Sequence, residues 1–237
     1  MKKIILRSII IVLLFLQSCL PFVAKKLQLD AKNPSIEKLQ INEKEVYFMG
    51  MSHLAKKEFY DNTKLLVKEF QSKGFVFYVE AITELDKTKF ILDTFYAKKF
   101  RKLTEIDLTI RYSMSENLLL QKLKTKYNLI DQPKYDSFGM KNFKRVDFNY
   151  TELVDGYENK FEKIVLDSCD LRTDIGKPYN CQKSSLLKRM NFRNELVFKS
   201  RNKLITDSIL NSNDKRIVIV YGRRHLDGIK EILVNQK

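Results

Sequence analysis

Residues 217–222, Ile217-Val218-Ile219-Val220-Tyr221-Gly222, form an unbroken apolar run that ends at a glycine. A short continuous apolar run that ends at a breaker indicates a strand buried on both faces, as in a parallel sheet. Two other runs have the same character, Val46–Met49 before Gly50 and Phe75–Val79 before Glu80. The three runs predict the central strands of one sheet.

Segments with helical spacing separate these strands along the chain. We expect helices over residues 56–73, 86–103, 116–127, 152–166, 184–210 and 226–234, the fifth of them broken somewhere along its length. Residues 143–148 predict a further strand or extended segment. Apolar strands that alternate with helices favour an α/β fold. The expected architecture is a compact, mostly parallel sheet flanked by helices, with a helix-rich insertion in the middle of the chain.

The composition excludes several classes of protein. Of 237 residues, 44% are hydrophobic, which argues against wholesale disorder. The three cysteines are too few for a disulfide-dense miniprotein or a cysteine-rich zinc module. The chain holds 44 Lys+Arg against 29 Asp+Glu, a formal net charge of +15.

The first residues have the pattern of a secretory signal. Lys2, Lys3 and Arg7 precede the apolar run Ile9–Leu16, which is short for a membrane span. Leu16-Gln17-Ser18-Cys19 resembles a bacterial lipobox, in which the cysteine carries acyl chains such as palmitate and becomes the N-terminus. The alternative is an uncleaved N-terminal anchor.

We therefore expect three parts: a lipoprotein signal peptide over residues 1–18, the lipidated Cys19 and a tether over 19–43, and a folded domain over 44–237. The expected location is the bacterial cell envelope, outside the cytoplasm, facing the periplasm or at the cell surface. Loss of three positive charges with residues 1–18 leaves +12. Such a protein is drawn to anionic lipid surfaces. Export, scattered basic residues and the lack of a nucleic-acid motif argue against nucleic-acid binding.

With Cys19 acylated, Cys169 and Cys181 remain. In an oxidising compartment an even number of thiols favours one disulfide, which would close a short loop around Gly176-Lys177-Pro178. A cysteine nucleophile or metal site is the alternative, although neither histidine lies near these cysteines in sequence.

The chain has two histidines, and both stand three residues after a glycine that follows a predicted strand. The two motifs are Gly50-Met51-Ser52-His53 and Gly222-Arg223-Arg224-His225. Ligands of open α/β sheets bind at the carboxyl ends of the strands, so both imidazoles and Glu80 are expected in one crevice. The glycines would permit a tight turn before each histidine.

Two imidazoles and a carboxylate suit two kinds of chemistry. His53, Glu80 and His225 could ligate a divalent cation such as manganese, cobalt or zinc and leave a position open for an activated water. Asp147 would be a further candidate ligand. Alternatively, one histidine acts as a metal-free general base that Glu80 holds.

The paired motifs resemble those of the TraB/Tiki (GumN-like) family, over about residues 44 to 235. The residues that carry the resemblance are Gly50, His53, Glu80, Arg201, Asn202, Gly222, His225, Leu226 and Gly228. The family belongs to a wider group with the erythromycin-esterase-like and ChaN-like proteins. The resemblance implies a metal-dependent hydrolase, most of all a peptidase, with His53, Glu80, His225 and Arg201 as catalytic residues.

The same crevice would bind a peptide or a small molecule. Arg201, Asn202 and Arg224 are the candidate substrate-binding residues, because guanidinium groups bind carboxylates or phosphates in a bidentate manner. Arg193-Asn194 is an alternative to Arg201-Asn202, which we favour for its spacing to the last strand.

Two alternatives to an enzyme remain open at this point. The ChaN-like branch suggests a non-catalytic lipoprotein that binds haem or another ligand, for which one histidine would have to lie exposed over a wide apolar slot. The other alternative is an interaction protein at the membrane surface whose motifs are inert.

Overall fold

A computed structural model of the chain describes residues 21, 24–25, 27–41, 43–82, 90–107 and 118–235. The predicted signal peptide and Cys19 lie outside the described residues. Among the helices that are described, none is long and apolar enough to cross a membrane.

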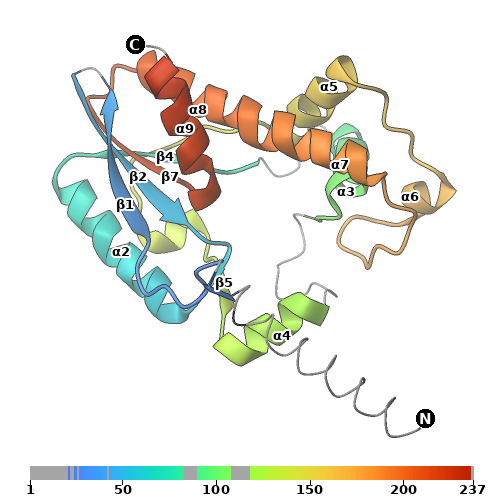
Figure 1. Ribbon diagram of the computed structural model, residues 1–237, viewed down its shortest axis with the longest axis horizontal. Helices are drawn as coiled ribbons and strands as arrows, with labels where there is room; N and C mark the ends of the chain where they lie inside the picture. The colour runs from blue at the N-terminus through green and yellow to red at the C-terminus, as the bar shows by residue number, and fades with distance from the viewer. Residues whose placement is uncertain are drawn as a thin grey trace, which may run out of the picture.

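The fold is α/β, built on a mixed sheet of five strands in the order β1-β2-β7-β4-β6 (Figure 1). The bounds are β1 Ser35–Ile41, β2 Lys44–Met51, β4 Val76–Val79, β6 Phe143–Arg145 and β7 Arg216–Gly222. Four strands are parallel, and β1 pairs antiparallel with β2 at one edge. The predicted mostly parallel sheet is confirmed.

Most of the described helices fall on predicted segments, with two differences: the helix expected over residues 152–166 ends at Lys160, and a short helix over Ser168–Arg172 lies where no helix was predicted. Their bounds are α2 Lys57–Ser72, α3 Phe90–Thr104, α4 Leu118–Tyr127, α5 Tyr150–Lys160, α6 Ser168–Arg172, α7 Leu186–Asn191, α8 Arg201–Leu210 and α9 Leu226–Asn235. The expected break within residues 184–210 is a π-helix, η4 (Phe192–Ser200), which joins α7 to α8 without interrupting the helical rod.

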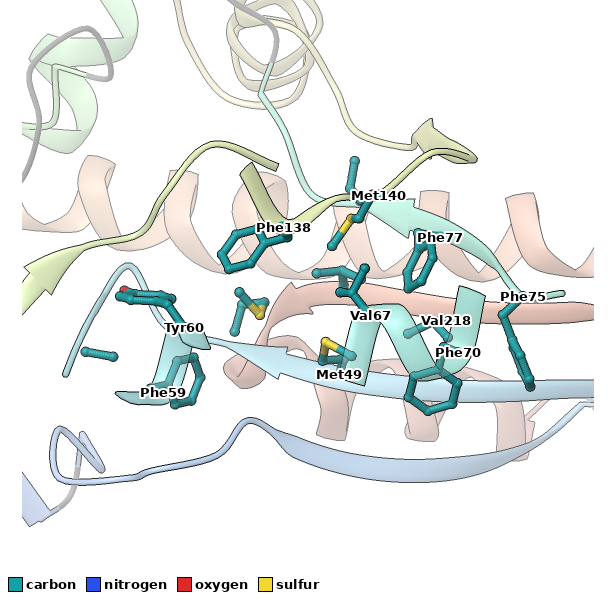
Figure 2. Packing of buried hydrophobic residues seen from close by; sticks show 14 residues of the cluster. Met49, Phe59, Tyr60, Val67, Phe70, Phe75, Phe77, Phe138, Met140 and Val218 are labelled. Carbon is teal, nitrogen blue, oxygen red and sulfur yellow. The ribbon is translucent and has the colours of Figure 1, made fainter. Parts of the chain in front are cut away.

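Each face of the sheet has its own apolar core. On one face, side chains of β2, β4 and β7 pack against α2 and the 3₁₀ helix η3 (Tyr135–Phe138); Figure 2 shows Met49, Phe77 and Val218 among them. On the other face, Ile205 and Ile209 of α8, with Ile229 of α9, cover the sheet. Continuous burial on both faces is the physical reason that these strands are apolar throughout.

The helix-rich insertion forms a core of its own. Side chains of α3, α5 and η4 pack around Phe100, Leu153 and Phe192. This part of the chain lies beside the sheet at the far end of the rod formed by α7, η4 and α8 (Figure 1). The predicted middle insertion is therefore a second helical layer beside the sheet.

The segment predicted as a tether is partly folded. Residues 35–41 form β1, so the sheet begins before Lys44, where the sequence placed the domain boundary. Further upstream, Ala24 and Leu29 are buried against Leu54 and Leu123. The sequence did not predict β1 because most of its residues are polar or exposed, and only its Leu39 and Ile41 side chains reach the core.

A disulfide joins Cys169 and Cys181, as predicted, across a sequence separation of 12 residues. The loop that it closes is also held by Arg101 of α3, which donates hydrogen bonds to the carbonyl oxygens of Thr173 at 2.7 Å and Asp174 at 2.8 Å. The disulfide thus fixes the outer end of the insertion.

Replacing both cysteines, Cys169→Ser/Cys181→Ser, should lower the free energy of unfolding by about 3 kcal/mol, because the unfolded chain gains the freedom of the open loop. For a domain of this size that loss corresponds to a fall in Tm of about 6–12 °C. Thermal unfolding measures it. A reductant should lower the Tm of the parent protein and leave the double variant unchanged; equal sensitivity of the two would contradict the assignment.

Candidate functional site

The site lies at the carboxyl ends of the four parallel strands. Because these strands run side by side in register, the residues that follow them meet at one edge of the sheet. His53 follows β2, Glu80 follows β4, Asp147 follows β6, and Gly222 ends β7 just before the 3₁₀ helix η5 (Arg223–His225). The arrangement predicted from the two glycine–histidine motifs is the arrangement that the sheet produces.

Arg201 is the centre of the site. Its side chain is 3% exposed and lies between two carboxylates. Its Nε donates to Asp147 Oδ1 at 2.7 Å, and its Nη2 donates both to Asp147 Oδ2 at 2.6 Å and to Glu80 Oε1 at 2.7 Å. The bidentate partner of Arg201 is therefore Asp147 of the same chain, whereas the sequence placed a substrate there.

Glu80 is held from two sides. Oε1 accepts from Arg201, and Oε2 accepts from the backbone N–H of Gly222. Burial alone would raise the pKa of Glu80, but the positive charge of Arg201, with smaller contributions from His225 and His53, lowers that pKa to about 2. Glu80 is thus a fixed carboxylate at neutral pH.

The glycines of the motifs act differently from the expectation. Gly50 and Gly222 both lie in strands, and neither is among the glycines with positive φ in the described part of the chain, so no tight turn depends on them. A Cβ on Gly222 would come within 3.1 Å of Glu80 Oε2. The absence of a side chain therefore lets this carboxylate approach the end of β7 closely.

His225 is buried, and its orientation is set by Asn202. Nδ1 lies 2.7 Å from Asn202 Oδ1, so the ring carries its proton on Nδ1 when neutral, and Nε2 keeps its lone pair. Nε2 lies 3.8 Å from Glu80 Oε1, a gap that a bridging water or substrate hydroxyl would fill. Burial, with the positive Arg201 and Arg224 nearby, lowers the pKa of His225 to about 4, against the raising effect of Glu80.

Gly228 explains how Asn202 reaches this position. A Cβ at residue 228 would lie 2.1 Å from Asn202 Nδ2, which is too close for two non-bonded atoms. The close approach of α9 to α8 at Gly228 therefore makes room for the amide that holds His225.

His53 differs from His225 because it is exposed. It lies in the loop between β2 and β3 (Leu54–Ala55), and its backbone carbonyl accepts from the N–H of Gln132 at 2.9 Å. A proton on His53 would lower the pKa of both Glu80 and His225, so His53 lies within electrostatic reach of each. The site thus brings together both histidines and Glu80.

Two tyrosines of the site carry no sequence signal. Burial, together with Glu80, raises the pKa of Tyr135 in η3. Tyr221 donates its hydroxyl to the carbonyl oxygen of Val146, and its ring lies edge-on to His225 at 5.3 Å. Both phenols are neutral donors. Gln132 adds an acceptor, since its Oε1 is buried with no hydrogen-bond partner in the described part of the chain.

The remaining predicted residues lie at the rim. Arg224 is exposed and stacks over Phe198, with its guanidinium carbon 5.0 Å from the ring centroid. Arg223 points away from the site and donates to Leu27 O and Gln28 Oε1 of the N-terminal segment. Arg193 and Asn194, the alternative pair, are exposed on η4, so Arg201 and Asn202 are the pair that enters the site.

The residues present do not fit a divalent cation held by Glu80. A cation on Oε1 would lie beside the Arg201 guanidinium, which already occupies that oxygen at 2.7 Å, and Oε2 is taken by a backbone N–H. Among the described residues no group of three or more His, Cys, Asp or Glu side chains has a geometry that could hold a metal ion. The metal centre stays a prediction of the sequence alone.

Comparison of the chain with known protein families, with curated proteins and with solved structures finds no match in any of the three. The resemblance to the TraB/Tiki family therefore stays a prediction that depends on the motif residues.

Replacing Arg201 by Met should lower the free energy of unfolding by about 3–5 kcal/mol at pH 7, because Glu80 and Asp147 are then buried without a cation. The loss should shrink as the pH falls towards 5, since the unpaired carboxylates take up protons in the folded state. Urea unfolding at several pH values measures both effects. Arg193→Met, an exposed arginine eight residues away, is the matched control and should change stability by no more than about 0.5 kcal/mol.

His225 should make the stability of the protein depend on pH. Its folded pKa of about 4 lies below the ordinary value of 6.5. Between these two pH values His225 is protonated in the unfolded chain and neutral in the folded chain. The stabilisation is complete above pH 6.5 and is lost as the pH falls towards 4. Between pH 7 and 5, the parent should lose about 2 kcal/mol more than His225→Gln. Equal losses in the two proteins would refute this assignment.

Proposed function

We propose that the protein is an envelope-anchored hydrolase that cleaves a carbonyl bond, an ester or a peptide, by general-base catalysis without a metal ion. The observation that carries this proposal is the convergence of His53, Glu80 and His225 at the carboxyl edge of the sheet, with one imidazole exposed and the other buried. The exposed imidazole can exchange a proton with a substrate that arrives from solvent, while the buried groups hold the reactants in place.

In this mechanism His53 is the general base. It takes a proton from a water molecule while the water oxygen forms a bond to the carbonyl carbon. The carbonyl electrons move to oxygen and then return, breaking the bond from carbon to the leaving group. Protonated His53 gives its proton to the leaving oxygen or nitrogen, so the products are an acid and an alcohol or amine.

Buried groups of the site would orient the reactants. The Nε2 lone pair of neutral His225 accepts a hydrogen bond from the attacking water, next to Glu80 Oε1 at 3.8 Å. Tyr135 keeps its proton because burial raises its pKa, and it donates to the oxygen that becomes negative. Arg201 and Asn202 act as positioning residues, through Glu80 and His225 respectively.

The proposed location in the cell envelope has separate support. The basic residues, the apolar run and the lipobox at Cys19 predict acylation, and the disulfide between Cys169 and Cys181 suits an oxidising compartment.

The test is hydrolysis of p-nitrophenyl esters and peptide p-nitroanilides by the full chain. His53→Ala should lower kcat/KM by about 100- to 10,000-fold while the Tm stays unchanged, because an exposed general base contributes to the reaction and little to packing. Lys134→Ala, an exposed residue of the neighbouring loop, is the matched control and should keep full activity.

Two further measurements separate the alternatives. Activity that is lost in a chelator and restored by manganese, cobalt or zinc would overturn the metal-free mechanism and favour the metal-dependent one. A Soret band on addition of haem that disappears in His53→Ala would favour the ligand-binding protein instead.

A further inference from the structure

A basic groove lies outside the candidate site, between the start of α2 and the end of α4. It has a volume of about 450 Å³ and is lined by Lys56, Lys57, Glu58, Lys126, Tyr127 and Asn128. Both helices lie on the side of the molecule that also holds the small sheet of β3 and β5 (Ile130–Asp131) (Figure 1). The groove is open, and four of its six lining residues are charged, so it suits a charged group at a surface.

Two positive charges of the basic groove are uncompensated. Lys57 pairs with Asp61 at 2.6 Å, and Glu58 pairs with Lys32 at 3.3 Å. Lys56 and Lys126 form no ion pair with any residue that the structure describes, and Lys126 is exposed. The charge of this groove therefore favours an anion.

The N-terminal segment reaches the fold at the same place. Ala24 and Leu29 are buried in a small apolar cluster with Leu54 of β3, Leu123 of α4 and Leu129. Leu54 and Leu123 are each within three residues of a lysine of the groove. Ala24 stands five residues after Cys19 in the sequence, and an extended chain of that length spans at most about 18 Å. A bilayer that holds acylated Cys19 must therefore lie close to the basic groove.

We propose that the basic groove docks the protein on a bilayer that contains anionic phospholipids, with headgroup phosphates beside Lys56 and Lys126. Charge complementarity and the short distance to the predicted anchor both point to this occupant. Lysines near an anionic membrane surface each favour the docked state, and two of them together shift the equilibrium by about 30-fold.

Docking would also orient the candidate site towards the membrane. His53 lies three residues before Lys56, and its carbonyl accepts from Gln132, just after β5. The exposed His53 would then lie near the lipid headgroups, so the substrates of the site would be molecules held at the membrane. This last consequence rests on the proposed function, whereas docking itself does not.

The chain contains no tryptophan, so one introduced indole reports on its surroundings alone. The full chain with Tyr127→Trp, purified in detergent, is reconstituted into vesicles of brominated phosphatidylcholine with or without brominated phosphatidylglycerol. The fluorescence of the Tyr127→Trp variant should be quenched strongly on the anionic vesicles and weakly on the neutral ones. Thr125→Trp, at an exposed position of the same helix, is a second reporter if the first variant is destabilised.

Matched variants locate the effect. Lys56→Glu/Lys126→Glu should abolish the additional quenching on anionic vesicles, as should high salt, which screens the charges. Lys141→Glu/Lys215→Glu makes the same change in net charge at exposed lysines that precede the amino ends of β6 and β7, and this variant should keep the additional quenching. A Phe143→Trp reporter, at the amino end of β6, should stay unquenched.

Three results would overturn the proposal: equal quenching of the Tyr127→Trp variant on neutral and anionic vesicles, equal losses in both charge variants, or quenching of Phe143→Trp as strong as that of Tyr127→Trp. None of these measurements uses hydrolysis. Failure of docking is therefore distinguishable from failure of the proposed enzyme.

Discussion

The buried ion pair of Arg201 with Glu80 and Asp147 holds the ends of three elements together. Glu80 follows β4, Asp147 follows β6, and Arg201 begins α8, so one guanidinium fixes a helix to two neighbouring strands. Two carboxylates around one cation leave an excess negative charge in a poorly hydrated place. The backbone N–H of Gly222, which donates to Glu80, balances part of it. Such a network is stable only when each member is in position.

The position of Arg201 depends in turn on the helix that carries it. A π-helix over Phe192–Ser200 adds residues to each turn before α8 begins, and this shifts which side chains face the sheet. Arg193 and Asn194 face solvent, while Arg201 and Asn202, with the same two side chains in the same order, are buried. The π-helix marks the place where the rod passes from the helical insertion to the site.

The sequence predicts most of the sheet and much of the site, and the reasons are physical. Strands buried on both faces must be apolar, so β2, β4 and β7 can be recognised in the sequence. Parallel strands end at the same edge of the sheet, so His53, Glu80 and His225 come together there. β1 was missed because an edge strand needs few apolar residues. Tyr135 was missed because its place depends on how η3 packs, and Arg201 was assigned to a substrate because a sequence does not show that Asp147 faces it.

The contacts divide the motif residues into two kinds. Gly228 makes room for Asn202, Asn202 fixes the tautomer of His225, and Arg201 with Gly222 fixes Glu80; all of these contacts lie inside the protein. Of the two histidines and the glutamate, His53 is the one that is exposed to solvent. Because these buried groups are already paired, they have little freedom to rearrange. They hold the Nε2 lone pair of His225 and the carboxylate of Glu80 at a fixed separation. A substrate that arrives from solvent must therefore contact His53 first. The surface around His53 then decides which molecules reach the site.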